Sequence, residues 1–177
     1  MNNLKWNQCK IDPWVGCSYF RDKQKILVVG LSTYHDKKIN DDKQNQIINT
    51  KRASEGCRPN RYWTNIMQTI TNRHHTLWDI EEESIFWNSV ALYNYIQTIQ
   101  EGTKDKSLPK DFRDSEKAFE EVLQKLKPKH ILIFSPSVFD YIRWKMKGDA
   151  LVLRLPHPSR GIKMSVWSPV ISEHLKQ

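Results

Sequence analysis

A continuous apolar run near the start of the chain constrains the fold more than any other feature. Residues 26–29 read Ile-Leu-Val-Val without a polar interruption. Such a run is typical of a strand that is buried on both faces, at the centre of a parallel sheet. Gly30 is expected to end this strand, and the mostly polar segment 31–36 follows it. Because ligands of open α/β sheets bind beyond the carboxyl ends of the strands, this turn is a candidate site.

Three later segments repeat the strand pattern, and helical segments separate them. Further strands are expected at residues 89–95, 131–134 and 150–155. Helices are expected at residues 59–70, 79–87, 115–126 and 136–142, with a last helix opened by Ser168 and Pro169. Strands that alternate with helices favour a parallel sheet covered on both faces and joined by right-handed crossovers. The pattern therefore predicts an α/β fold, a three-layer α/β/α arrangement with a four-stranded parallel sheet.

The length and the charge of the chain bound its organisation and its partners. The 177 residues are expected to form one domain, residues 1–177, in which residues 1–24 are a lead-in that packs on the sheet. The formal charge is +8 and the pI is about 9.4, and the basic residues are spread along the chain. A folded basic face favours a polyanionic partner, here DNA. The polar residues 37–58 are expected to be a long loop or an irregular helix.

The cysteines and the N-terminal residues argue against several classes of protein. Cys9, Cys17 and Cys57 match no common zinc or disulfide framework and are interpreted as reduced thiols. We therefore expect neither a metal nor another cofactor. Residues 1–12 lack the apolar core of a signal peptide, and no apolar run approaches the ~20 residues that span a bilayer. The expected protein is a cytoplasmic monomer that does not bind membranes.

Polar residues follow three of the four expected strands. Asn94 is expected at the carboxyl end of the second strand, and His157 and Ser159 come after the fourth. The turn after the first strand contributes Ser32, Tyr34, His35 and Asp36. Alone, an asparagine at a strand end is usually a turn former, and a histidine between prolines is often structural. Because the carboxyl ends of parallel strands meet at one edge of a sheet, their convergence favours a shared site.

The three strand-end segments also form an ordered set of motifs. Residues 30–35 read Gly-Leu-Ser-Thr-Tyr-His, Asn94 follows at the second strand, and residues 157–160 read His-Pro-Ser-Arg. This order resembles the uracil-DNA glycosylase superfamily, whose best-known branch has Gly-Gln-Asp-Pro-Tyr-His as its first motif and His-Pro-Ser-Pro at the start of its last. The resemblance covers roughly residues 25–175. It implies the fold of that superfamily and cleavage of an N-glycosidic bond in DNA.

The resemblance implies a role for each matched residue. The target nucleotide would be flipped out of the duplex, because a stacked base cannot be reached. Asn94 would read the Watson–Crick edge of the base with its amide, and His157 would stabilise the negative charge that grows on the leaving base. Tyr34 would form a wall of the pocket. The remaining substrate contacts would come from Gly30, Leu31, His35 and an aromatic ring of Tyr62 or Trp63, and the DNA contacts from Ser159, Arg160, Gly161 and Lys163.

The first motif departs from the family in its acid. Ser32 stands where the best-known branch has a carboxylate, and Leu31 aligns with the glutamate of another branch. Asp36 is the nearest acid, so Ser32 and Asp36 join Asn94 and His157 as catalytic candidates. An oxocarbenium-like transition state can still be reached slowly when the leaving group is stabilised. The iron–sulfur branches need four cysteines, so the three cysteines of this chain argue against a cluster.

Three functions are compatible with these features. The first is a monofunctional DNA glycosylase that excises uracil or another modified base, including hypermodified bases of phage DNA. The second is a DNA-binding module that has kept the fold and lost catalysis. The third is a small-nucleotide hydrolase that uses the same crevice, although the chain lacks the glycine-rich phosphate loop of nucleoside-triphosphate enzymes.

Overall fold

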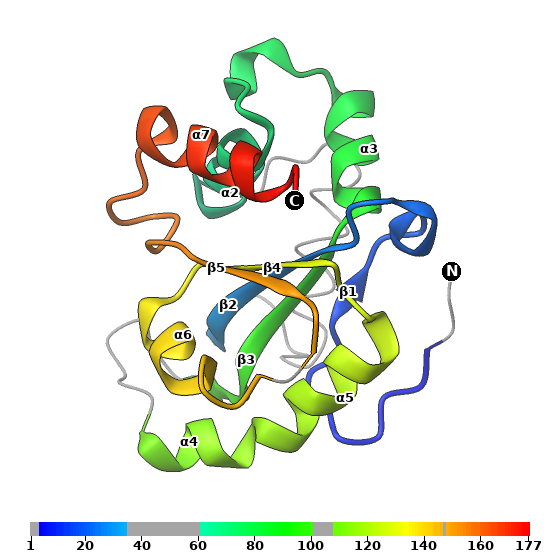
Figure 1. Cartoon of the computed structure of the whole chain (residues 1–177), viewed down its shortest axis with the longest axis vertical. Helices are drawn as coiled ribbons and strands as arrows, with labels where there is room; N and C mark the ends of the chain where they lie inside the picture. The colour runs from blue at the N-terminus through cyan, green and yellow to red at the C-terminus, as the bar shows by residue number, and fades with distance from the viewer. Residues whose placement is uncertain (1–3, 35–60, 101–107, 147) are drawn as a thin grey trace.

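The structure, a computed structural model, describes residues 4–34, 61–100, 108–146 and 148–177. Within these ranges, five strands form one sheet in the order β1-β3-β2-β4-β5 (Figure 1). The strands are β1 Trp14–Val15, β2 Ile26–Tyr34, β3 Ala91–Gln100, β4 His130–Ile133 and β5 Leu151–Arg154. Strands β2 to β5 run parallel, and β1 pairs antiparallel with β3. The chain is therefore an α/β protein with a mixed sheet.

The predicted sheet of four parallel strands is wrong in one respect, because the lead-in adds a fifth, antiparallel strand. β1 pairs with Ala91 and Leu92 at the edge of β3. Gly16 follows β1 at once, and a methyl group on Gly16 would come within 2.2 Å of the Asn88 carbonyl oxygen. A strand of two residues is too short to show an alternating pattern, so the sequence carries no signal for it.

Helices lie on both sides of the sheet (Figure 1), and the continuous apolar run of β2 contributes to a core on each face. Val28 packs in the core under α2 Arg61–Thr71, α3 Ile80–Ser89 and α7 Met164–His174. Leu27 and Val29 pack on the opposite face with α5 Glu116–Leu126 and α6 Pro136–Ile142. The shorter elements are η1 Tyr19–Arg21, η3 His75–Leu77 and α4 Pro109–Asp114. Successive strand residues point to opposite faces, so a strand covered on both sides needs this unbroken apolar run.

Two strands run further than the sequence predicts. β2 continues past Gly30 to Tyr34, and β3 continues past Asn94 to Gln100. Gly30 pairs with Asn94 in the middle of both strands, and the register shifts between Ser32 and Tyr34. The predicted strand ends at Gly30 and Asn94 are therefore wrong. A glycine inside a strand often marks the close approach of another group to the backbone, and that is its role here.

Side-chain caps start two of the helices where the sequence places them. Ser135 Oγ accepts a hydrogen bond from the Val138 backbone N at 3.4 Å, and Pro136 occupies the first turn of α6. At α3, the Asp79 carboxylate accepts from the Glu82 N at 2.8 Å, and the Glu82 carboxylate accepts from the Asp79 N at 3.2 Å. These caps satisfy backbone amides that have no partner within the helix, which explains why such starts can be predicted locally.

The last helix differs from its prediction. α7 begins at Met164 rather than at Ser168, and Pro169 lies inside it. Proline removes one helical hydrogen bond, which α7 tolerates because Pro169 is on its exposed side. Ile171 is fully buried, whereas Val170 is 41% exposed and does not enter the core.

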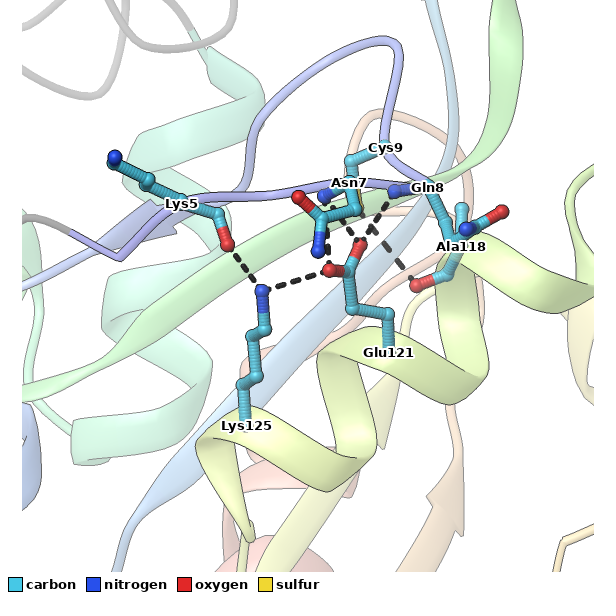
Figure 2. Close-up of polar contacts among 7 residues, drawn as sticks. All are labelled: Lys5, Asn7, Gln8, Cys9, Ala118, Glu121 and Lys125. Atoms are coloured by element: carbon cyan, nitrogen blue, oxygen red, sulfur yellow. Dashed lines mark hydrogen bonds and ion pairs between the residues drawn. The ribbon is translucent and has the colours of Figure 1, made fainter.

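A buried carboxylate holds the lead-in against α5 (Figure 2). Glu121 accepts hydrogen bonds from the backbone N of Asn7 at 2.9 and 3.1 Å, from the N of Gln8 at 2.8 Å and from Lys125 Nζ at 2.7 Å. Lys125 also donates to the carbonyl of Lys5. Burial alone would raise the pKa of Glu121, but these bonds outweigh it and lower the pKa to about 2. The carboxylate is therefore ionised and fully partnered.

The described residues also bear on the cysteines and on membrane insertion. Cys9 and Cys17 are free thiols, and Cys57 lies outside the described residues. No helix in the described ranges has the length and apolarity needed to cross a bilayer.

Candidate active site

Gly30 and Asn94 meet across neighbouring strands at the centre of the candidate site. They are partners in the register of β2 and β3. A methyl group added at Gly30 would come within 2.2 Å of Asn94 Oδ1 and within 2.8 Å of the Tyr62 hydroxyl oxygen. The missing side chain of Gly30 therefore leaves the space that these two polar atoms occupy. The glycine is required here by the approach of two side chains rather than by a turn.

Thr33 holds the amide of Asn94. Asn94 Nδ2 donates to Thr33 Oγ1 at 3.1 Å, and the Thr33 side chain is buried. The backbone carbonyl of Asn94 accepts from Gln97 Nε2 at 2.9 Å. The register shift of the β2–β3 ladder lies next to Thr33, and such irregularities commonly redirect side chains near binding sites. The amide is therefore fixed in place while part of its hydrogen-bonding capacity stays available.

His157 follows β5 and reaches the same region through Tyr62. The two ring centroids lie 5.6 Å apart, with the rings tilted by 55°. His157 Nδ1 accepts a hydrogen bond from the Ser159 N at 3.2 Å, so the neutral ring carries its proton on Nε2. Burial, and then the nearby positive charge of Arg160, lower the pKa of His157 below its usual value. At neutral pH the imidazole is therefore an uncharged hydrogen-bond donor.

The N-terminal half of α2 faces this cluster. Tyr62 lies between the Gly30 backbone and the His157 ring, and Asn65 Nδ2 donates to the Pro158 carbonyl at 2.7 Å. Trp63, predicted to contact the substrate, is 7% exposed and packs in the core against Trp87, with 5.4 Å between the ring centroids.

Only some of these α2 residues were predicted. Tyr62 was proposed, beside Trp63, as the stacking ring, and Asn65 was missed. The helical period does separate Trp63, Ile66, Met67 and Ile70 on the core side from Tyr62 and Asn65 on its flank. That signal shows which face of α2 is buried, but it does not show that the flank meets the turn after β5.

The first motif is described only in part. The Ser32 hydroxyl is buried and has no hydrogen-bond partner among the described residues. Leu31 packs at the margin of the core on the α5 side of the sheet. Tyr34 closes β2, while His35 and Asp36 lie outside the described residues. In the described part of the motif, the Ser32 hydroxyl therefore takes the position at which the resemblance implies a carboxylate.

The predicted DNA contacts lie together on the turn between β5 and α7. Ser159, Arg160, Gly161 and Lys163 are all exposed. The turn is closed by a bond from the Arg160 N to the His157 carbonyl at 3.0 Å, and Gly161 has a φ of +87°, which favours glycine. The turn therefore places two basic side chains in solvent, three and six residues after His157.

This arrangement suits a planar polar ligand that gains negative charge. The Asn94 amide can donate and accept, and His157 can donate from Nε2. In the described part of the chain, no group of three or more His, Cys, Asp or Glu side chains could hold a metal ion. A scan against protein-family models and a search of curated proteins find no match for this chain.

Proposed function

We propose that the protein is a monofunctional DNA glycosylase with the fold of the uracil-DNA glycosylase superfamily, and that it excises uracil or another modified base to leave an abasic site. One observation carries this proposal. Asn94 Oδ1 and the Tyr62 hydroxyl share the space over Gly30, and the Tyr62 ring packs on His157. The two groups that the reaction needs, a base reader and a leaving-group donor, are thus joined by one side chain.

The sheet topology supports the same reading. The chain passes from β2 to β3 on one side and then crosses to β4 and β5 on the other, so the strand order reverses between β2 and β4. In open α/β sheets, ligands bind at such a switch point, outside the carboxyl ends of the strands. Gly30 lies on β2, and the turn with His157 follows β5. We therefore propose that the base pocket lies at this edge of the sheet, towards the carboxyl ends of the parallel strands.

The proposed reaction breaks the bond between C1′ of the sugar and the ring nitrogen of the flipped base. Asn94 holds the base edge through its amide oxygen and nitrogen. As the bond breaks, its electron pair goes to the base, and the Nε2–H of His157 donates to a base oxygen that gains negative charge. The neutral imidazole makes this hydrogen bond with its own Nε2–H and does not need to be protonated first. Water then adds to C1′, and its proton ends on solvent or on the base.

The proposed site stabilises the positive charge on the sugar less well than the negative charge on the leaving base. The Ser32 hydroxyl can orient a water molecule, but it cannot balance the positive charge of an oxocarbenium-like sugar as a carboxylate would. Asp36 is the proposed source of that charge. Tyr34 and His35 would complete the pocket wall, whereas the expected contact of Leu31 is wrong, because Leu31 packs on the opposite, α5 side of the sheet. Without a carboxylate near C1′, leaving-group stabilisation by His157 carries most of the rate enhancement.

The exposed turn after His157 would hold the DNA. Arg160 and Lys163 would neutralise phosphates, and Ser159 and Gly161 allow the backbone to approach the groove closely. The formal charge of +8 favours encounter with a polyanion. We propose a monomer that works on DNA in the cytoplasm and needs no cofactor.

An abasic-site assay tests this function. The protein is incubated in excess with duplex and single-stranded DNA that contains uracil, hypoxanthine or hypermodified phage bases, and abasic sites are revealed by alkaline cleavage. We expect abasic sites on at least one substrate, with strong loss in His157→Ala and Asn94→Ala. The control variants His74→Ala and Asn88→Ala change the same residue types in and before α3, outside the candidate site. Product from no substrate, or full activity in both site variants, contradicts the proposal.

A DNA-binding module without catalysis is the second candidate. The buried Ser32 hydroxyl favours it, because no carboxylate stands in the described part of the first motif. This candidate predicts salt-dependent DNA binding with no abasic product, and the slope of affinity against salt would report the number of phosphates neutralised.

A further inference from the structure

Asn65 lies beside the candidate site but has no part in the proposed reaction. Its Nδ2 donates to the carbonyl of Pro158, the residue directly after His157, at 2.7 Å. Ninety-three positions of sequence separate the two bonded residues, so this contact joins α2 to the turn after β5. Asn65 is only half-buried, and its side chain is directed at a backbone acceptor rather than at the core.

The hydrogen bonds inside the turn cannot locate it within the fold. The Ser159 N donates to His157 Nδ1, and the Arg160 N donates to the His157 carbonyl. Both bonds join residues of the turn itself, so they move with it. The Asn65 bond, in contrast, reaches a separate element. The start of the turn is held by the Leu155 N, which donates to the Ile133 carbonyl of β4 at 2.8 Å. The Asn65 bond holds the turn to α2 on the far side of His157 and so limits how the imidazole can move.

α2 is a rigid support for this bond. Ile66 and Met67 are almost completely buried in the core beside Asn65, and Thr69 Oγ1 donates to the Asn65 carbonyl at 2.6 Å. Tyr62, three residues before Asn65, packs on the His157 ring. Residues three apart share a face of a helix, so α2 holds His157 by its ring and Pro158 by its carbonyl.

We propose that Asn65 is a positioning residue, which fixes the direction of the His157 Nε2–H towards the base by holding the Pro158 carbonyl. This inference rests on the proposed function. A donor displaced by about 1 Å from a developing charge can cost up to about 100-fold in rate. Asn65 touches neither the base nor the DNA in this account and acts only through His157.

Asn65→Leu tests the proposal, since leucine keeps the size of the side chain and removes its donor. Asn65→Gln is the conservative variant that retains an amide. The matched control is Asn88→Leu, because Asn88 Nδ2 also donates to a backbone carbonyl, that of Ser84 at 2.9 Å, but within α3. Two quantities are measured. They are the imidazole shifts of His157 during an NMR pH titration, assigned with His157→Gln, and the single-turnover rate of abasic-site formation.

If the turn moves, the His157 ring loses part of the burial that lowers its pKa. We therefore expect Asn65→Leu to raise the pKa of His157 and to lower the rate of abasic-site formation by about 10- to 100-fold. Asn65→Gln should recover part of both changes, and Asn88→Leu should change neither. An unchanged His157 titration in Asn65→Leu overturns the positioning role. If the titration changes while the wild-type protein forms no abasic sites on any DNA, the contact holds His157 as proposed and the glycosylase function is wrong.

Discussion

The Glu121 cluster, which consists of Glu121, Asn7, Gln8 and Lys125, and the candidate active site are both polar. They differ in how completely their polar groups are hydrogen-bonded. Both Glu121 oxygens accept hydrogen bonds, from Asn7, Gln8 and Lys125 (Figure 2). At the candidate site, the buried Ser32 hydroxyl has no partner among the described residues. Asn94 Nδ2 donates there to Thr33 and keeps a second hydrogen that it can donate.

This difference separates a cluster that stabilises the fold from one prepared for a ligand. Every hydrogen bond stabilises the buried carboxylate, which then has no acceptor position left for a ligand. A buried polar group without a partner costs free energy and needs an explanation, such as a bound water molecule or a ligand. Among the described residues, Tyr93, His130 and Ser168 also have such groups, but Ser32 is the one that lies on β2 two residues after Gly30. We therefore expect changes at Glu121 to alter stability alone, and changes around Gly30 to alter activity most.

Gly30→Ala should have the largest effect. Its methyl group would overlap Asn94 Oδ1 and crowd the Tyr62 hydroxyl, so both side chains must move. We expect the single-turnover rate of base excision to fall by about 100-fold or more. The free energy of unfolding should fall by about 1–3 kcal/mol, the usual cost of overpacking. A variant that keeps the wild-type rate would show that the space over Gly30 has no part in the reaction.

Glu121→Gln should affect the other region. The neutral amide cannot serve the two backbone amides and the Lys125 ammonium as the carboxylate does. The free energy of unfolding, measured by urea denaturation, should fall by about 1–3 kcal/mol. Excision activity per folded molecule should stay the same. Glu120→Gln is the control, because Glu120 is the exposed neighbour on α5. Equal losses in the two variants would remove the special role of Glu121.

The Glu121 contribution should also depend on pH. Its pKa is lowered in the folded protein from 4.5 to about 2. A lowered carboxyl pKa stabilises the folded state above the ordinary pKa, and this contribution is lost as the pH falls through the folded-state value. The stability gap between the wild type and Glu121→Gln should therefore narrow as the pH falls below about 4.5. A gap that is constant with pH would mean that the carboxylate charge does not matter.

Arg160→Gln should give the smallest effect of these changes. It measures how much the Arg160 charge contributes to the His157 pKa and to DNA binding. Burial is the larger cause of the lowered His157 pKa, and the Arg160 charge is the second. Removing that charge should raise the pKa of His157 only part of the way to its usual value, as followed by NMR. DNA affinity should fall modestly, and the salt slope should decrease by about one. Lys127→Gln, at an exposed lysine after α5, is the control.

Features with local signals were predictable from the sequence. The buried run of β2, the strand β4 and the Ser135 cap of α6 need only neighbouring residues to be recognised. The features that were missed depend on partners distant in sequence. β1 exists because β3 offers an edge, and β2 passes through Gly30 because Asn94 and Tyr62 fill the space above it.

The candidate site shows the same division. The convergence of Asn94 and His157 was expected from the carboxyl ends of parallel strands, although Asn94 proves to lie in mid-strand. The contacts of Tyr62 and Asn65 were not foreseen, because they depend on how α2 is docked over the sheet. Helical periodicity shows which face of α2 is buried, but it does not reveal which loop that helix touches.

The most direct test of the central claim is the release of a free base from DNA by the intact protein. Mass spectrometry would follow DNA that carries uracil or other modified bases, with enzyme in excess and His157→Ala in parallel. We predict that the wild type releases one of these bases and leaves an equal amount of abasic sites, and that His157→Ala releases at least about 100-fold less. Release of no base, or equal release by both proteins, would contradict the account.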